Sequence, residues 1–264
     1  MPRFRLVEVY PVAGGWSRPW IDDPDADDFA KVSRGICDLY STHLAEADLR
    51  HAVSALRIFV GDYVHPDTPA AGDGHAGVLS PTSTDRPEGY EHATVRVPTG
   101  FAAWPLGDRQ RVVLDAVHEA ALGVATLRGW EPDAFQRARK AVESADFTFT
   151  WTGPWKSSPG RRWRARCAFR SLPDGFGRLV LEVAGPEDEA VCATSSEQIA
   201  WTTMESYRRA ARTLRWATAA RLEVIPCVVL GFAGDKFVAE LTAEAGRLRL
   251  DDVQAAAPFG SSRA

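Results

Sequence analysis

Three residues of one expected helix have the types and spacing of an acid–base or metal site. Asp115, His118 and Glu119 stand at positions i, i+3 and i+4, so a helix brings their side chains to neighbouring places on one side. A carboxylate beside a histidine orients the imidazole as a general base or helps it to hold a metal ion. The alternative is an ordinary polar face, opposite the apolar stripe that contains Val113 and Val117.

A second group of possible ligands lies in the stretch HPDTPAAGDGH. His65, Asp67, Asp73 and His75 form a nearly symmetric set of two imidazoles and two carboxylates, which could bind zinc or another divalent ion. The stretch belongs to a long segment rich in proline and glycine, 64–91, which preorganises ligands poorly. We therefore expect neither a metal nor another cofactor, because turn formation explains these residue types.

The pattern RRWRARCAFR, residues 161–170, predicts a strand with one apolar and one basic face. Apolar residues alternate with arginines from Trp163 to Phe169. No acidic residue occurs from 147 to 173, which leaves the basic face without a local partner. The candidate residues for binding a partner or an anionic ligand are Trp155, Lys156, Arg162, Arg164, Arg166 and Arg170. Guanidinium groups bind phosphates and an exposed tryptophan stacks on bases, whereas the sequence pI of about 5.9 disfavours nucleic acid.

An expected helix nearer the C-terminus carries a further basic stripe. Thr202 and Glu205 have the spacing of a capping box, which predicts a helix from there to about residue 218. Its polar side carries Arg208, Arg212 and Arg215. The stripe extends the basic strand face if the helix packs beside it, pairs with the acidic residues 22–28 if they meet, or is a solvated face.

Composition limits the class of protein that must position these residues. The chain has 264 residues, of which 45% are hydrophobic and 25% charged, as in globular proteins with a sizeable core. No apolar run approaches the roughly 18 residues of a membrane helix, and the N-terminus lacks the pattern of a secretory signal. We expect no membrane association and a cytoplasmic location. The four widely spaced cysteines are expected to be buried, reduced thiols.

The N-terminal part of the chain predicts a strand followed by two helices. Residues 3–10 read as a strand, and the aspartates of 22–28 are placed to cap a helix that follows. A second helix is expected over 46–56, and a strand follows it. We expect 1–63 to form an N-terminal segment and 64–91 a long loop before the main region.

The main region, 92–264, predicts an αα-hairpin and an antiparallel sheet. Asp108 is a plausible N-cap, Gly129 is placed to end the first helix, and Pro132 fits the start of the second. Three consecutive antiparallel strands are expected in 147–184, followed by C-terminal hairpins. The fold class is α+β, a mostly antiparallel sheet flanked by helices, and the main region packs with 1–63 if both belong to one domain.

Three hypotheses for the function follow. Missing catalytic motifs, segregated charge and nine tryptophans favour a cytoplasmic protein-binding module, such as an immunity or accessory protein that masks a charged site of its partner. The first alternative is an enzyme that uses either of the two polar groups named above. The second is a protein that binds a phosphate-bearing ligand or nucleic acid through the strand face Arg162–Arg170. The sequence does not decide whether the protein is an enzyme.

Overall fold

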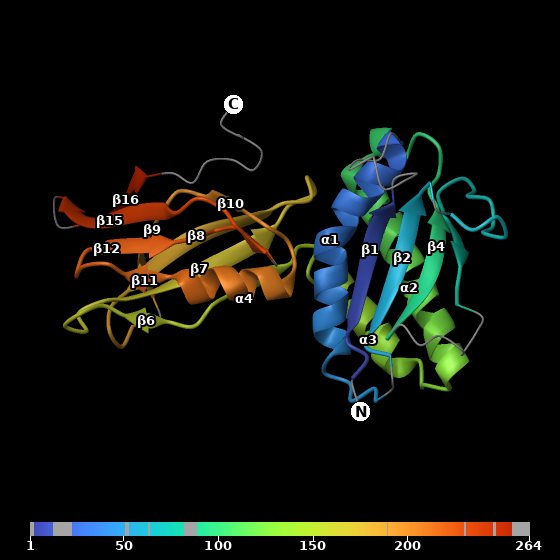
Figure 1. Cartoon of the computed structure of the whole chain (residues 1–264), viewed down its shortest axis with the longest axis horizontal. Helices are drawn as coiled ribbons and strands as arrows, with labels where there is room; N and C mark the ends of the chain where they lie inside the picture. The colour runs from blue at the N-terminus through green and yellow to red at the C-terminus, as the bar shows by residue number, and fades with distance from the viewer. Residues whose placement is uncertain are drawn as a thin grey trace. The chain divides into compact units, whose positions relative to one another are not determined.

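The computed structural model of the chain describes residues 3–12, 23–50, 53–62, 64–81, 89–188, 190–229, 231–244 and 247–254. The chain divides into two compact units: unit 1 comprises residues 1–149 and 173–175, and unit 2 comprises 150–172 and 176–264. Helices and mostly antiparallel sheets (Figure 1) confirm the α+β class. None of the helices in these ranges is long and apolar enough to cross a membrane.

The segment 64–91 belongs to unit 1, together with 1–63 and the start of the expected main region. The segment contributes strand β3 (Gly77–Leu79) and the start of β4 (Tyr90–Arg96). A Cβ added at Gly77 would lie 2.0 Å from the carbonyl oxygen of Pro69. Strand β3 pairs with β4, and the hydroxyl oxygens of Thr68 and Thr94 lie 2.6 Å apart, so the described part of the segment packs against the unit 1 sheet.

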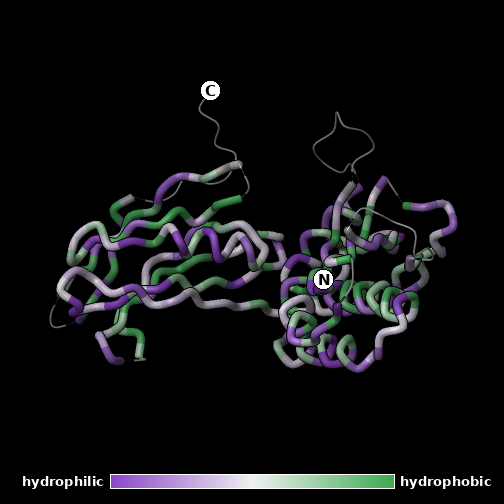
Figure 2. The backbone as a smooth tube through the Cα atoms, turned by 60° about the horizontal axis from the view of Figure 1, so that its bottom comes forward, coloured by the Kyte–Doolittle hydropathy of each residue, from purple (hydrophilic) through white to green (hydrophobic). Residues whose placement is uncertain are grey.

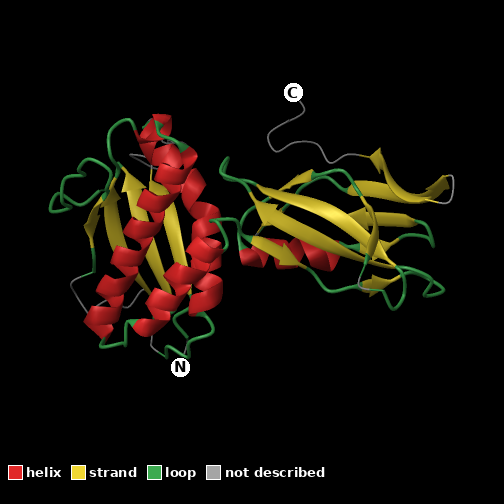
Figure 3. Cartoon of the chain, turned by 180° about the vertical axis from the view of Figure 1, so that it is seen from behind, coloured by secondary structure: helices red, strands yellow, loops and turns green. Residues whose placement is uncertain are grey.

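Unit 1 is a four-stranded sheet with helices on one face (Figure 3). The strand order is β1-β2-β4-β3, with β1 (Leu6–Val12), β2 (Ala55–Gly61) and β4 parallel and β3 antiparallel to β4. The helical elements are α1 (Pro24–Leu44), η1 (Phe101–Ala103), α2 (Leu106–Arg128) and α3 (Asp133–Ser144). The crossover helix α1 makes the parallel pairing of β1 and β2 possible.

The expected helix over 46–56 is wrong. The described residues around it form turns, and Ala55 begins β2. Leu56, Ile58 and Val60 are fully buried, whereas the residues between them are partly exposed. This period of two fits a strand that is packed on one face, and it prevails over the helix-forming residues that precede it.

The αα-hairpin is confirmed. Gly129 ends α2 with φ 66°, in the left-handed region, and the N–H of Trp130 donates to the carbonyl of Ala125 at 2.9 Å. The predicted N-cap is wrong, because α2 begins at Leu106 and Asp108 lies within its first turn, paired with Arg111.

Unit 2 contains two main sheets and one helix. The first has the order β10-β8-β7-β5, with β6 on β7 and β9 on β8; the second has the order β11-β12-β15-β16; and β13 pairs with β14. The bounds are β5 (Thr150–Thr152), β6 (Lys156–Ser157), β7 (Arg164–Ser171), β8 (Gly177–Ala184), β9 (Val191–Thr194), β10 (Gln198–Ala200), α4 (Met204–Thr213), β11 (Arg215–Trp216), β12 (Arg221–Val224), β13 (Val228–Val229), β14 (Phe232–Ala233), β15 (Phe237–Glu244) and β16 (Arg247–Gln254). The predicted meander is confirmed as β5, β7 and β8. Hydrophobic and hydrophilic residues alternate along these strands (Figure 2).

Helix α4 is anchored by an aromatic contact and is shorter than expected. The ring of Phe169 lies 4.7 Å from the ring of Tyr207, both of which are buried. The N-cap is Thr203, whose hydroxyl accepts from the N–H of Ser206 at 3.2 Å, rather than Thr202. The helix ends at Thr213 instead of residue 218, because the chain turns into strand β11.

Candidate anion-binding site

The first group of candidates, on α2, is not assembled into one site. His118 is buried, and its Nδ1 lies 2.9 Å from the hydroxyl oxygen of Tyr40. Asp115 is half-exposed and pairs with Arg139 at 2.5 Å, whereas Glu119 is exposed. The carboxylates lie at the surface and the imidazole lies inside, so the structure does not bring the three groups together around one point.

The surroundings of His118 and Tyr40 keep both groups neutral. Burial lowers the pKa of His118, and the nearby guanidinium of Arg139 lowers it further. Burial also raises the pKa of Tyr40. The pair is a buried hydrogen bond between α1 and α2, which links the helices and offers little access to a substrate.

The second group, in 65–75, forms local turns. The backbone N–H of Asp67 donates to Nδ1 of His65 at 3.2 Å, and Gly72 pairs with His75. Asp73 is exposed at the turn between these two partners. Within the described ranges, no cluster of three or more histidine, cysteine, aspartate or glutamate side chains could hold a metal ion.

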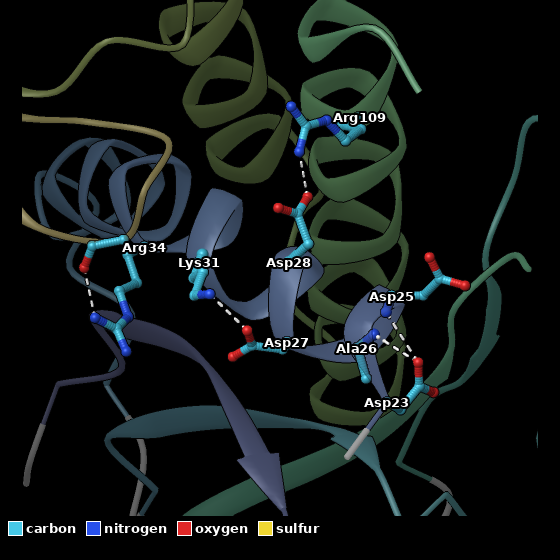
Figure 4. Close-up of polar contacts among 9 residues, drawn as sticks. Asp23, Asp25, Ala26, Asp27, Asp28, Lys31, Arg34 and Arg109 are labelled. Atoms are coloured by element: carbon cyan, nitrogen blue, oxygen red, sulfur yellow. Dashed lines mark hydrogen bonds and ion pairs between the residues drawn. The ribbon is translucent and has the colours of Figure 1, made fainter. Parts of the chain in front are cut away.

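The aspartates before and within α1 are satisfied inside unit 1 (Figure 4). Asp23 caps the helix and accepts from the N–H groups of Asp25 and Ala26. Asp25 in turn accepts backbone N–H groups of the η1 region. Asp27 pairs with Lys31, and Asp28 pairs with Arg109. Asp23 and Asp25 therefore bind backbone N–H groups, as capping residues do, whereas Asp27 and Asp28 form ion pairs. Asp22 lies outside the described residues.

The basic face of β7 finds its counter-charges within unit 2. Arg166 pairs with Glu182 on β8 at 2.6 Å, and Arg170 pairs with Glu197 at 2.6 Å. Arg164 donates to the carbonyl of Asp188. The guanidinium carbons of Arg164 and Arg166 lie 4.7 and 4.3 Å from the centre of the Trp155 ring. These interactions occupy the face that the sequence offered to a ligand.

The pairing of Arg166 with Glu182 carries a signal that the sequence reasoning missed. The turn at Asp174-Gly175 fixes a hairpin register in which Phe169 faces Leu179. The same register places Glu182 opposite Arg166. The lack of acidic residues from 147 to 173 therefore does not leave Arg166 without a partner, because Glu182 lies on the next strand.

A different place in unit 2 retains uncompensated charge. A hollow of about 490 Å³ lies between β6, the loop that follows it, and β11. Its lining residues are Lys156, Ser157, Ser158, Pro159, Gly160, Arg161, Leu214, Arg215 and Trp216. Three of them are cationic and none is acidic. We name this feature the basic hollow.

The three cationic side chains of the basic hollow differ in the contacts that they make. The ammonium of Lys156 donates to the carbonyls of Arg212 and Leu214, at 3.0 and 2.7 Å, where α4 ends. Burial lowers the pKa of Lys156. Arg215 donates from Nε and Nη2 to Glu223, at 2.9 and 2.6 Å. Arg161 is exposed, and its side chain makes no hydrogen bond or ion pair within the described residues.

The basic character of this region continues along α4. Arg208 and Arg212 are exposed and stand one turn apart on the helix surface. Neither side chain forms an ion pair with any residue that the structure describes. The carbonyl oxygen of Arg212 accepts a hydrogen bond from the ammonium group of Lys156, so Arg208 and Arg212 lie beside the basic hollow.

The chain was compared with protein-family models, with curated proteins and with solved structures, and no match was found.

Proposed function

We propose that this protein is a binding module that recognises an acidic segment of a partner protein through unit 2. The observation that carries the proposal is an excess of cations at and beside the basic hollow. Within the described residues, the side chains of Arg161, Arg208 and Arg212 form no ion pair. Arg215 shares the single carboxylate of Glu223 with Lys236. Complementary charge steers the encounter of two proteins and selects the partner. Arginine and tryptophan are also the residues that most often dominate binding energy at interfaces.

A protein partner fits the charge distribution better than nucleic acid does. Unit 2 has 16 basic and 12 acidic residues, whereas unit 1 has 15 basic and 23 acidic residues. A long polyanion would experience the negative charge of unit 1, but a short acidic segment needs only a local patch. Trp155, the aromatic residue expected to stack on bases, already contacts two guanidinium groups.

The cysteines support the cytoplasmic location that belongs to this proposal. All four are free: Cys37, Cys167 and Cys227 are buried, and Cys192 is exposed. Burial raises the pKa of Cys167 to about 12. Free thiols persist in a reducing compartment.

The proposal is tested by the binding of a fluorescein-labelled poly-glutamate peptide to the full chain, measured by fluorescence anisotropy at low and at high salt. We expect Arg208→Glu/Arg212→Glu to weaken binding about tenfold at low salt, because it places two negative charges on the binding surface. Arg247→Glu, on β16 of the same unit, is the control, since its side chain is also exposed. Equal affinity of the double variant and the wild type, or no dependence on salt, would reject the proposal.

A further inference from the structure

The basic hollow differs from the rest of the basic surface in that cationic residues from separate segments line one open depression. Lys156 and Arg161 come from the β6–β7 connection, and Arg215 comes from the start of β11. A solvated basic face spreads its charges outward, where each one is surrounded by water. Here segments about 55 residues apart in sequence direct three cations to one hollow.

The backbone at Arg161 is in a conformation that most residues avoid. Gly160 has φ 80° and Arg161 has φ 56°, both in the left-handed region. Glycine adopts this region freely, whereas a residue with a Cβ loses about 1 kcal/mol or more there. The N–H of Arg161 donates to the carbonyl of Ser158 at 2.9 Å, which fixes the turn. An arginine in a glycine-like position, with its exposed side chain beside a hollow, suits a role in binding rather than in folding.

Arg215 is preorganised for the same role. Glu223 accepts two of its N–H groups and a further hydrogen bond from Lys236 at 3.1 Å. These hydrogen bonds lower the pKa of Glu223, so the carboxylate stays ionised and continues to hold the guanidinium. Its remaining N–H donors are available to a ligand, and a fixed guanidinium loses little freedom on binding.

Lys156 supplies a charge that has no acidic partner among the residues that the structure describes. Its ammonium has three N–H donors, two of which bond to carbonyl oxygens at the end of α4. The carbonyls satisfy its hydrogen bonds but do not neutralise its charge. The indole N–H of Trp216 donates to the carbonyl of Lys156 at 2.9 Å and fixes the opposite wall. An anion in the hollow would provide the missing counter-charge.

We infer that the basic hollow binds a phosphomonoester group, which is carried by the partner or by a free small molecule. Lys156 and Arg161 have no acidic partner among the described residues, and Arg215 keeps N–H donors beyond its pair with Glu223. This lining matches a dianion with three acceptor oxygens better than it matches a single carboxylate. The hollow of about 490 Å³ is open to solvent, which leaves room for a phosphate group that is attached to a larger molecule. This inference deepens the proposed function, because the phosphate would sit beside the arginines that bind the acidic segment.

The inference is tested by isothermal titration calorimetry of the full chain with three probes: a phosphoserine peptide, the same peptide with aspartate in place of phosphoserine, and adenosine monophosphate. We expect the phosphoserine peptide to bind at least about tenfold more tightly than the aspartate peptide. Binding of adenosine monophosphate identifies the phosphate group itself as the ligand, and its failure to bind assigns recognition to a phosphorylated protein segment. Equal affinity for phosphoserine and aspartate would overturn the inference.

The matched variants are Arg161→Gly and Arg162→Gly, which remove the same charge at neighbouring positions. Arg161→Gly suits the left-handed backbone, so the fold persists, and we expect phosphopeptide affinity to fall at least about tenfold. Arg162→Gly is expected to bind like the wild type, because Arg162 does not line the hollow. Unchanged affinity of Arg161→Gly would overturn the inference. The poly-glutamate assay with the Arg208/Arg212 variant separates this outcome from a failure of the proposed function.

Discussion

The two units use charged residues in opposite ways. In unit 1 the hollow of about 280 Å³ beside α2 and α3 contains Arg139 between Asp115 and Glu143, at 2.5 and 3.1 Å. The second cation of this hollow, Arg111, pairs with Asp108 at 2.9 Å, so the protein itself neutralises both cations. The larger hollow of unit 2 is lined by three cationic residues, of which only Arg215 pairs with an acidic residue that the structure describes, Glu223. Exposed charge therefore indicates a partner only where the fold leaves that charge uncompensated.

The largest effect is expected when the buried ion pair between Glu91 and Arg128 of unit 1 is broken. Glu91 on β4 is 1% exposed and receives two hydrogen bonds from Arg128 at the end of α2. We expect Arg128→Met to lower the free energy of unfolding by about 3–5 kcal/mol, because it leaves a buried carboxylate unpaired. Urea unfolding at neutral pH measures the loss. The double variant Glu91→Leu/Arg128→Met should recover most of it, and a loss below about 1 kcal/mol in the single variant would contradict the expectation.

The hydrogen bond between Tyr40 and His118 gives the next largest effect. Tyr40→Phe removes the hydroxyl that lies 2.9 Å from Nδ1 of His118 and leaves a buried nitrogen without that partner. We expect a loss of about 1–3 kcal/mol in the free energy of unfolding. Tyr10→Phe is the control, because Tyr10 is half-exposed and water can replace its bond to Glu8. Equal losses in the two variants would contradict a special role for the buried pair.

The lowered pKa of His118 predicts how the free energy of unfolding depends on pH. Burial lowers the pKa of His118 in the folded state, so the unfolded state binds a proton at a higher pH. The contribution of His118 to the free energy of unfolding is complete above about pH 6.5. It decreases as the pH falls below this value, by at most about 1.4 kcal/mol per pH unit. Urea unfolding between about pH 7.5 and about pH 5 should show a smaller slope for His118→Gln than for the wild type. A slope for His118→Gln equal to that of the wild type would contradict the expectation.

The smallest effect is expected on the basic face of unit 2. The side chains of Arg170 and Glu197 are 48% and 44% exposed, so Arg170→Ala should cost less than about 1 kcal/mol. Arg166→Ala should cost more, about 1–2 kcal/mol, since Arg166 pairs with a less exposed glutamate and contacts Trp155. Thermal unfolding compares the two variants. The reverse order would contradict the assignment of this face to intramolecular pairing.

Local signals predicted the parts of the fold that short stretches determine. Gly129 ends α2 as expected, because a left-handed C-cap needs only its own helix. The strand β7 alternates as predicted, since period two is a local property. The parallel pairing of β1 with β2 was not predicted, because its partners are separated by all of α1. The helix expected over 46–56 failed for the same reason: burial against distant helices decides that region.

The candidate site followed the same rule. Lys156 belonged to the predicted set of binding residues, but Arg161 and Arg215 did not. No local pattern links residues 156–161 to residues 214–216, which the fold brings to one hollow. Conversely, Arg166 and Arg170 were predicted from a local pattern, and their acidic partners came from other segments. The period of two in a sequence identifies which side chains share one face of a strand. Only the fold shows whether acidic residues neutralise the charges on that face.

Trp216 has a consequence for how occupancy can be observed. Its ring lines the basic hollow, and its indole N–H is fixed to the carbonyl of Lys156. A charged group that enters the hollow changes the electric field across this indole and therefore shifts its fluorescence emission. The difference between the spectra of the wild type and Trp216→Phe isolates this signal from that of the other tryptophans. The hollow thus contains its own optical reporter, which allows ligands to be screened without any label.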